Sequence, residues 1–127
     1  MADLVFDSSR RLLEWPALGK YWRAVSGPYG LGPLPAGLYK VARQQITEYT
    51  SAIAEPFKDR TGYGFFLPIT PLFDTDRGKT GGRLGIHPDG NKPGTLGCIG
   101  ITEPDTSGFY NAIKLTPATA KLILEVR

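Results

Sequence analysis

The sequence predicts a mostly β fold with one or two short helices. Its 127 residues include 16 glycines and 11 prolines, which exceeds average usage and favours short strands and turns over long helices. The apolar runs are short and are bounded by these turn formers. Hydrophobic residues make up 41% and charged residues 21% of the chain, so the composition is that of a globular protein, and its length suits a single domain over residues 1–127.

Four short strands are predicted in the first part of the chain. Residues 4–6 and 11–15 are apolar segments separated by the turn formers of residues 7–10, so they predict a hairpin. Residues 21–26 predict a third strand. Residues 38–41 predict a fourth, after a stretch that is too rich in glycine and proline to be regular structure.

The middle of the chain is harder to assign. Residues 44–56 fit either a short helix or an extended connection. Residues 63–73 are strongly apolar but contain Pro68 and Pro71. Proline lacks the N–H that a central strand donates, so we expect an edge strand or a broken strand here. Residues 74–82 predict a polar loop that borders the candidate site described below.

A short helix and a last strand are predicted near the end of the chain. Asp105 or Thr106 is the expected N-cap of the helix, and Pro117 is expected to end it. Residues 121–126 read as the last strand. The apolar face of the helix would consist of Phe109, Ala112, Ile113 and Leu115.

The only histidine and the only cysteine lie in two short apolar segments, residues 83–87 and 97–101. The turn formers between them predict an antiparallel return of the chain, with His87 opposite Cys98. Side chains alternate across a strand, so both would share one face, above two glycines that leave room for another group to lie there. The opposite, apolar face would be formed by Leu84, Ile86, Ile99 and Ile101.

A thiol beside an imidazole suggests a nucleophile and its base, because the thiolate is the reactive form and a neighbouring imidazolium lowers its pKa. The amides of Gly97 and Cys98 would point at the oxygen of an attacked carbonyl. Two alternatives stay open: another Cys–His thiol hydrolase, and a non-catalytic β binding module in which Cys98 is buried. A metal site is not expected, because zinc needs three or four ligands, and no other cofactor is expected.

The active segment resembles that of a known family. His87-Pro-Asp-Gly90, followed by Gly94-Thr-Leu-Gly-Cys98, is similar to the L,D-transpeptidase catalytic domain of bacterial peptidoglycan enzymes, which carries an upstream His and then Ser/Thr-His-Gly-Cys. Leu96 stands in place of the second His, and Gly100 in place of a common Arg or Asn. The short His–Cys interval resembles a compact branch that includes type VI secretion effectors and phage-encoded relatives. The matching residues are Thr95, Gly97, Cys98 and Ile99.

This resemblance, which extends in outline over residues 20–127, implies a curved sheet or β-sandwich. It also implies acyl transfer at L,D bonds of the peptidoglycan stem peptide, through a thioester on Cys98, as a transpeptidase or carboxypeptidase. His87 would give the leaving amine its proton. Three further residues are candidates for binding substrate. Arg83 would bind a carboxylate of the substrate, Asp89 would bind a cationic group of the substrate, and Thr95 would form hydrogen bonds within the active loop. A turn role for Asp89 and Thr95 and a surface role for Arg83 stay open.

Charge and hydropathy limit the partners. The net charge of +3 comes without a basic run or an aromatic-basic motif, so no nucleic-acid partner is expected. No apolar run approaches the roughly 20 residues of a membrane span. The first residues do not resemble a signal peptide. We therefore expect synthesis in the cytoplasm and action in the periplasm or cell wall after delivery by a secretion system or phage lysis, unless a signal has been trimmed. The expected partners are stem peptides and, for an effector, an immunity protein.

Overall fold

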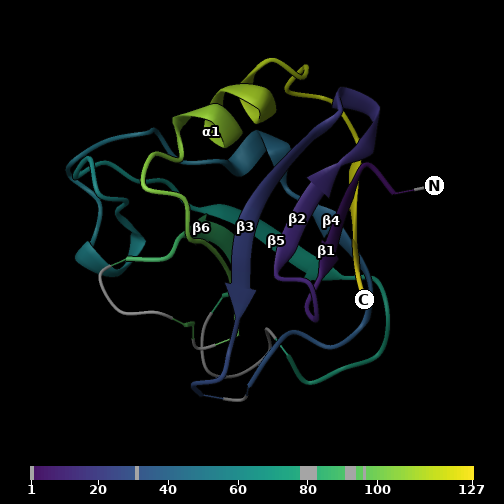
Figure 1. Ribbon diagram of the computed structural model, residues 1–127. Coiled ribbons are helices and arrows are strands. Elements are labelled where there is room, and N and C mark those ends of the chain that lie inside the picture. The colour runs from purple at the N-terminus through teal and green to yellow at the C-terminus, as the bar shows by residue number, and fades with distance from the viewer. Residues whose placement is uncertain (1, 31, 78–82, 91–93, 96) are drawn as a thin grey trace.

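The strands close into a barrel in the order β1-β2-β3-β7-β6-β5-β4-β8. Figure 1 shows this fold as a ribbon, with β1 to β6 and the helix α1 labelled. This computed structural model describes residues 2–30, 32–77, 83–90, 94–95 and 97–127. The prediction of a mostly β fold is confirmed. The strands are β1 (Leu4–Asp7), β2 (Leu12–Trp15), β3 (Lys20–Ser26), β4 (Gly37–Val41), β5 (Leu67–Pro71), β6 (Gly85–Pro88), β7 (Ile99–Ile101) and β8 (Leu122–Val126).

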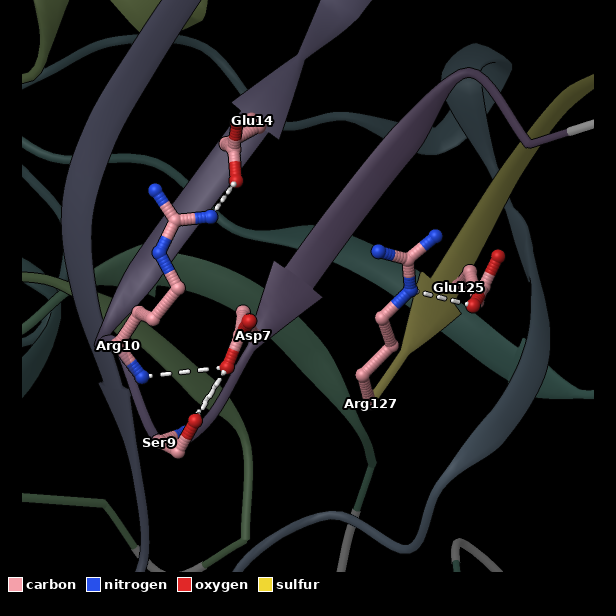
Figure 2. Close-up of polar contacts among 6 residues, drawn as sticks. All are labelled: Asp7, Ser9, Arg10, Glu14, Glu125 and Arg127. Atoms are coloured by element: carbon pink, nitrogen blue, oxygen red, sulfur yellow. Dashed lines mark hydrogen bonds and ion pairs between the residues drawn. The ribbon is translucent and has the colours of Figure 1, made fainter.

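The predicted hairpin at the start of the chain is confirmed, since β1 and β2 pair antiparallel. The Asp7 carboxylate holds its turn by accepting hydrogen bonds from the Ser9 hydroxyl and from the amides of Ser9 and Arg10 (Figure 2). These bonds lower the pKa of Asp7, the one from the Ser9 hydroxyl most. The ion pairs beside this turn, Arg10 with Glu14 among them, are exposed and contribute little to stability.

The prediction that residues 63–73 contain an edge or broken strand is wrong, because β5 pairs with β4 on one side and β6 on the other. The prolines are accommodated because the ladder uses their carbonyls. Pro68 accepts the Ala42 amide at 2.9 Å, while the neighbouring Ile69 amide donates to the Leu84 carbonyl at 3.0 Å. The central position of β5 therefore needs no amide from Pro68.

Residues 44–56 contain no α-helix and are bracketed by two 3₁₀ turns, η2 (Arg43–Gln45) and η3 (Glu55–Phe57). The predicted helix is present as α1 (Ser107–Lys114) with Thr106 at its N-cap position. Its expected apolar face is correct except at the last residue. Leu115 follows the helix and is 85% exposed, so its inclusion in that face was wrong.

The core fills the barrel, and α1 covers one end of it (Figure 1). Phe109 of α1 is fully buried and meets the edge of Trp22 with ring centroids 5.0 Å apart. It also stacks on Phe65 at 5.8 Å. Aromatic pairs of this kind add to the stability gained by burying their area. Among the described residues, no helix is long and apolar enough to cross a membrane.

A buried carboxylate fastens α1 to the segment that follows η3. Asp59 Oδ2 accepts hydrogen bonds from the amide and the hydroxyl of Thr106 and from the Tyr49 hydroxyl. Its other oxygen accepts from Thr61. Burial raises the pKa of Asp59, but the hydrogen bonds from Thr61, Thr106 and Tyr49 outweigh this and hold the pKa below its ordinary value.

Asp59→Ala is expected to lower the free energy of unfolding by about 2–4 kcal/mol, because it leaves the buried Thr106 donors without an acceptor. Urea unfolding at neutral pH measures this. Glu48→Ala removes an exposed carboxylate nearby and is the matched control, with an expected change within about 0.5 kcal/mol. Equal losses in both variants would contradict the structural role of Asp59.

Candidate functional site

The segments that carry His87 and Cys98 are neighbours in the barrel, but they run parallel. Ile86 lies opposite Ile99, and His87 lies opposite Gly100. The predicted antiparallel return with His87 opposite Cys98 is therefore wrong. Cys98 comes one residue before β7 and so lies level with the beginning of β6, whereas His87 lies towards its end.

The connection between β6 and β7 crosses to the end of β3 instead of turning back on itself. Thr95 donates its amide to the Gly27 carbonyl at 2.8 Å and accepts the Tyr29 amide at 3.1 Å, which makes a parallel bridge with Pro28. The chain then enters β7 at the end where β3 finishes and β6 begins, so β7 is antiparallel to β3 and parallel to β6. Residues 91–93 and 96 of the predicted loop lie outside the described residues.

The predicted division into two faces holds despite the different pairing. Each of His87 and Cys98 is next in the chain to an inward residue, so strand alternation directs both to the outer side of the barrel wall. The expected apolar set is buried in the core: Leu84, Ile86, Ile99 and Ile101.

The two glycines leave room on this face as predicted, and the protein itself fills that room. A Cβ on Gly85 would lie 2.4 Å from the ring of Phe66. A Cβ on Gly100 would lie 2.8 Å from Asp89 Oδ1 and from Thr95 Cγ2. The missing side chains therefore allow an aromatic ring and the active loop to lie against the strands.

His87 lies in an aromatic environment and is only 5% exposed. Its ring centroid is 4.6 Å from that of Phe57 and 6.0 Å from that of Phe66. Nδ1 lies 2.6 Å from the Pro88 carbonyl oxygen, which only accepts, so Nδ1 carries the proton and Nε2 carries the lone pair. Burial lowers the pKa of His87 to about 4, against a small opposing effect of the Pro88 bond. The ring is neutral at pH 7.

The basic nitrogen of His87 keeps contact with solvent. Nε2 makes no hydrogen bond within the described residues. In that part of the chain no buried side-chain nitrogen or oxygen lacks a hydrogen-bond partner. An unbonded Nε2 is therefore not fully buried, and it can accept a proton from a group that reaches it.

Cys98 is partly exposed, and its side chain is directed to the beginning of β6. The thiol donates to the Arg83 carbonyl with Sγ and O 3.6 Å apart. Burial raises the pKa of the thiol, and the Gly85 amide offsets only part of this effect. The thiol is therefore protonated at neutral pH, and the structure holds no thiolate–imidazolium pair.

Sulfur and imidazole share a face but are not hydrogen-bonded to each other, since each binds a different carbonyl. Cys98 and His87 are one strand and two residues apart, so their Cα atoms are about 8 Å apart, given a rise of about 3.3 Å and a strand spacing of about 4.8 Å. Long side chains bridge such a diagonal. Direct contact requires the thiol to leave the Arg83 carbonyl.

The Thr95 hydroxyl organises the backbone around the cysteine, which confirms its expected hydrogen bonding within the active loop. It donates to the Cys98 carbonyl at 2.6 Å and accepts the amides of Gly27 and Gly97 at 3.0 and 3.2 Å. The Gly97 amide is thus already used, so its predicted role as an oxyanion donor does not fit this structure. The Cys98 amide is the other member of the predicted pair.

Asp89 is buried in the same loop and holds its backbone. Its carboxylate accepts the Gly94 amide at 3.1 Å and lies over Gly100. Burial raises the pKa of Asp89 to about 6, although the Gly94 bond lowers it. Its loop-holding role agrees with the alternative that it is a turn residue. A substrate-binding role stays a prediction for both Asp89 and Thr95.

Arg83 is exposed, and its guanidinium carbon lies 5.2 Å from the centroid of the Phe66 ring. It also lines a pocket of about 420 Å³, and its backbone carbonyl accepts the Cys98 thiol. The structure therefore brings Arg83, Thr95 and Gly97 around the cysteine. His87 and Asp89 lie further along β6 and beyond its end.

Three residues of this site were not anticipated. Phe57 and Phe66 enclose His87, and Arg77 lies beside Gly97, where an added Cβ would be 3.5 Å from Nη1. Phe66 belongs to the aromatic run 63–73, but nothing in that run marks it as a neighbour of His87. Arg77 falls in the predicted loop 74–82, of which residues 78–82 lie outside the described residues.

No family model and no curated protein matches this chain. Within the described residues, no three His, Cys, Asp or Glu side chains are grouped as metal ligands. The chemistry of the site therefore depends on the geometry of one thiol, one imidazole and their surroundings.

The buried His87 and Asp89 have opposite effects on stability. Native His87 takes up a proton only near pH 4, whereas the unfolded chain does so near pH 6.5. Between these values the unfolded state binds more protons, so the free energy of unfolding falls as the pH falls, by about 3 kcal/mol in all. Native Asp89 keeps its proton up to about pH 6. Its contribution is present at low pH and is lost as the pH rises through 6.

Asp89→Asn should therefore reveal the His87 contribution, because asparagine can still accept the Gly94 amide but does not titrate. From about pH 7 to about pH 4, the free energy of unfolding should fall by about 3 kcal/mol in the variant and much less in the native protein. Urea unfolding across this range measures it. His87→Gln should reverse the slope. Parallel curves for the native protein and Asp89→Asn would count against the buried pair.

Iodoacetamide alkylation should report the un-ionised thiol. Its rate should rise with pH to a midpoint above that of the same thiol in the urea-unfolded chain, because burial raises the pKa of Cys98. Mass spectrometry at timed intervals gives the rate. A midpoint below that of the unfolded chain would mean that a thiolate–imidazolium pair forms in solution.

Proposed function

We propose that this protein is a cysteine-dependent acyl transferase or hydrolase that acts on the stem peptides of peptidoglycan, cleaving or exchanging the residue after an L,D bond. One observation carries the proposal. The hydrogen bond from His87 Nδ1 to the Pro88 carbonyl leaves Nε2 as proton acceptor on the face that also carries the partly exposed Cys98 thiol. A nucleophile, a base and a group that orients the base are the three parts that thiol catalysis needs.

The proposed reaction starts from a neutral pair. The thiol leaves the Arg83 carbonyl and gives its proton to His87 Nε2 as Sγ attacks the substrate carbonyl. The Cys98 amide faces the oxyanion, and His87 then returns the proton to the leaving amine, which leaves a thioester on Cys98. Water or a second amine breaks the thioester and regenerates the thiol. Catalytic contacts that are loose without substrate commonly tighten in the complex.

The assignment to the L,D-transpeptidase catalytic fold is part of this proposal. It is supported by the motif around Cys98 and by the mostly β architecture. Action in the periplasm or cell wall, delivery as a type VI effector or by phage lysis, and pairing with an immunity protein belong to the same proposal and are supported by the motif alone.

The burial of His87 favours a second candidate. A ring that is 5% exposed and a thiol whose pKa is raised also suit a non-catalytic β module that binds peptides. In that case Cys98 is a small packing residue, and the protein binds stem peptides or other ligands without changing them.

Digestion of purified muropeptides decides between these candidates. The native protein should remove the terminal D-residue of a stem peptide, or replace it when another D-amino acid is supplied, as read by mass spectrometry. Cys98→Ala should abolish the reaction, and His87→Asn should slow it by about 10²–10⁴-fold, the usual contribution of a general base. Circular dichroism confirms that the variants are folded. Unchanged stem peptides with the native protein would refute the proposal.

A further inference from the structure

The pocket lined by Arg83, whose carbonyl accepts the Cys98 thiol, is a feature that the proposed chemistry does not use. Its volume is about 420 Å³, and its walls come from η2, from β5, from the segment after β5 and from the two residues before β6. Among the lining residues that the structure describes, two carry a charge, both are arginines, and none is a carboxylate. The lining residues are Gln45, Pro68, Ile69, Thr70, Pro71, Phe73, Thr75, Arg77, Arg83 and Leu84.

Arg83 is positioned by a layered contact. Gly85 lets the Phe66 ring lie against the backbone of β6, and the Arg83 guanidinium lies over that ring at 5.2 Å. An aromatic ring holds a guanidinium in place through its face. The N–H groups at the edge of the guanidinium can still donate hydrogen bonds. Among the described residues, no carboxylate forms an ion pair with Arg83. The arginine is therefore oriented without being neutralised.

Arg77 is anchored on the other side of the cysteine. Its Nη1 donates to the carbonyls of Gly32 and Pro33 at 3.2 and 3.0 Å and lies beside Gly97. These carbonyls fix the position of the guanidinium. Since the Arg83 carbonyl accepts the Cys98 thiol, both arginines border the nucleophile and line the pocket.

The remaining walls suit a small group with one charged end. Thr70, Thr75 and Gln45 supply hydroxyl and amide groups, whereas prolines, Phe73 and Leu84 supply apolar surface. Arginine is the residue best shaped to bind a carboxylate through two parallel hydrogen bonds. A partly enclosed site strengthens such contacts relative to open solvent.

We propose that Arg83 and Arg77 bind the free terminal carboxylate of a peptide whose last residue occupies this pocket, while the preceding carbonyl lies at Cys98. This inference rests on the proposed function for the position of the attacked carbonyl. It makes the enzyme act at chain ends, because an internal peptide bond has no carboxylate to offer. The released group is then the small C-terminal residue.

Peptide binding to a variant that lacks the nucleophile tests this inference without turnover. Cys98→Ala protein is titrated, by calorimetry, with a stem peptide ending in D-alanine and with the same peptide as its C-terminal carboxamide. The free acid should bind about tenfold more tightly, and added salt should reduce the difference. Arg83→Gln should bring the ratio close to one, and Arg83→Lys should restore part of it. Arg60→Gln, an exposed arginine outside the pocket, should leave the ratio unchanged.

Arg77→Gln should also reduce the ratio of the affinities for the free acid and the carboxamide. Its thermal melting should match that of the parent protein, which shows that the variant is folded. Equal or undetectable binding of acid and amide by the parent protein overturns the inference, as does a ratio that survives both arginine variants. If the protein with Cys98 binds the free acid more tightly than the carboxamide but converts neither peptide, the proposed function is refuted and the carboxylate site is supported. Turnover of acid and amide at equal rates refutes the carboxylate site alone.

Discussion

The parallel pairing of β6 with β7 is the constraint on which the candidate site depends. Barrel closure places β7 between β3 and β6, and the Thr95 contacts with Gly27 and Tyr29 bring the chain to the end at which β7 must start. This direction sets Cys98 level with the start of β6 and His87 nearer its end. The separation of the pair and the contact of the Cys98 thiol with the Arg83 carbonyl follow from that offset.

The same pairing explains why the outer face is filled. Two glycines on that face let Phe66 lie against one strand and the active loop against the other. Desolvation by these groups is what lowers the pKa of His87 and raises that of Asp89. The protein thus keeps an imidazole in its neutral form at neutral pH, with its tautomer set by a backbone carbonyl, so the ring is not the partner of a preformed thiolate.

Thr95 and Arg77 show how the backbone around the nucleophile is fixed without regular structure. One hydroxyl joins three backbone groups, at Gly27, Gly97 and Cys98, and one guanidinium joins two carbonyls of the loop after β3. Residues from three distant parts of the chain therefore converge on Cys98. The cation that anchors this loop also lines the pocket.

The sequence by itself determined the mostly β class, most of the strands and the position of the helix. It also determined the division of residues 84–101 into an apolar face and a face that carries His87 and Cys98. These features depend on local alternation and on turn formers. The direction of β7, the central place of β5 and the groups that cover His87 were decided only by the tertiary structure. They depend on which strands become neighbours when the barrel closes, and an alternating pattern is the same in parallel and antiparallel pairs. For the same reason Phe66 and Arg77, remote in sequence, could not be assigned to the surroundings of Cys98 before the chain was folded.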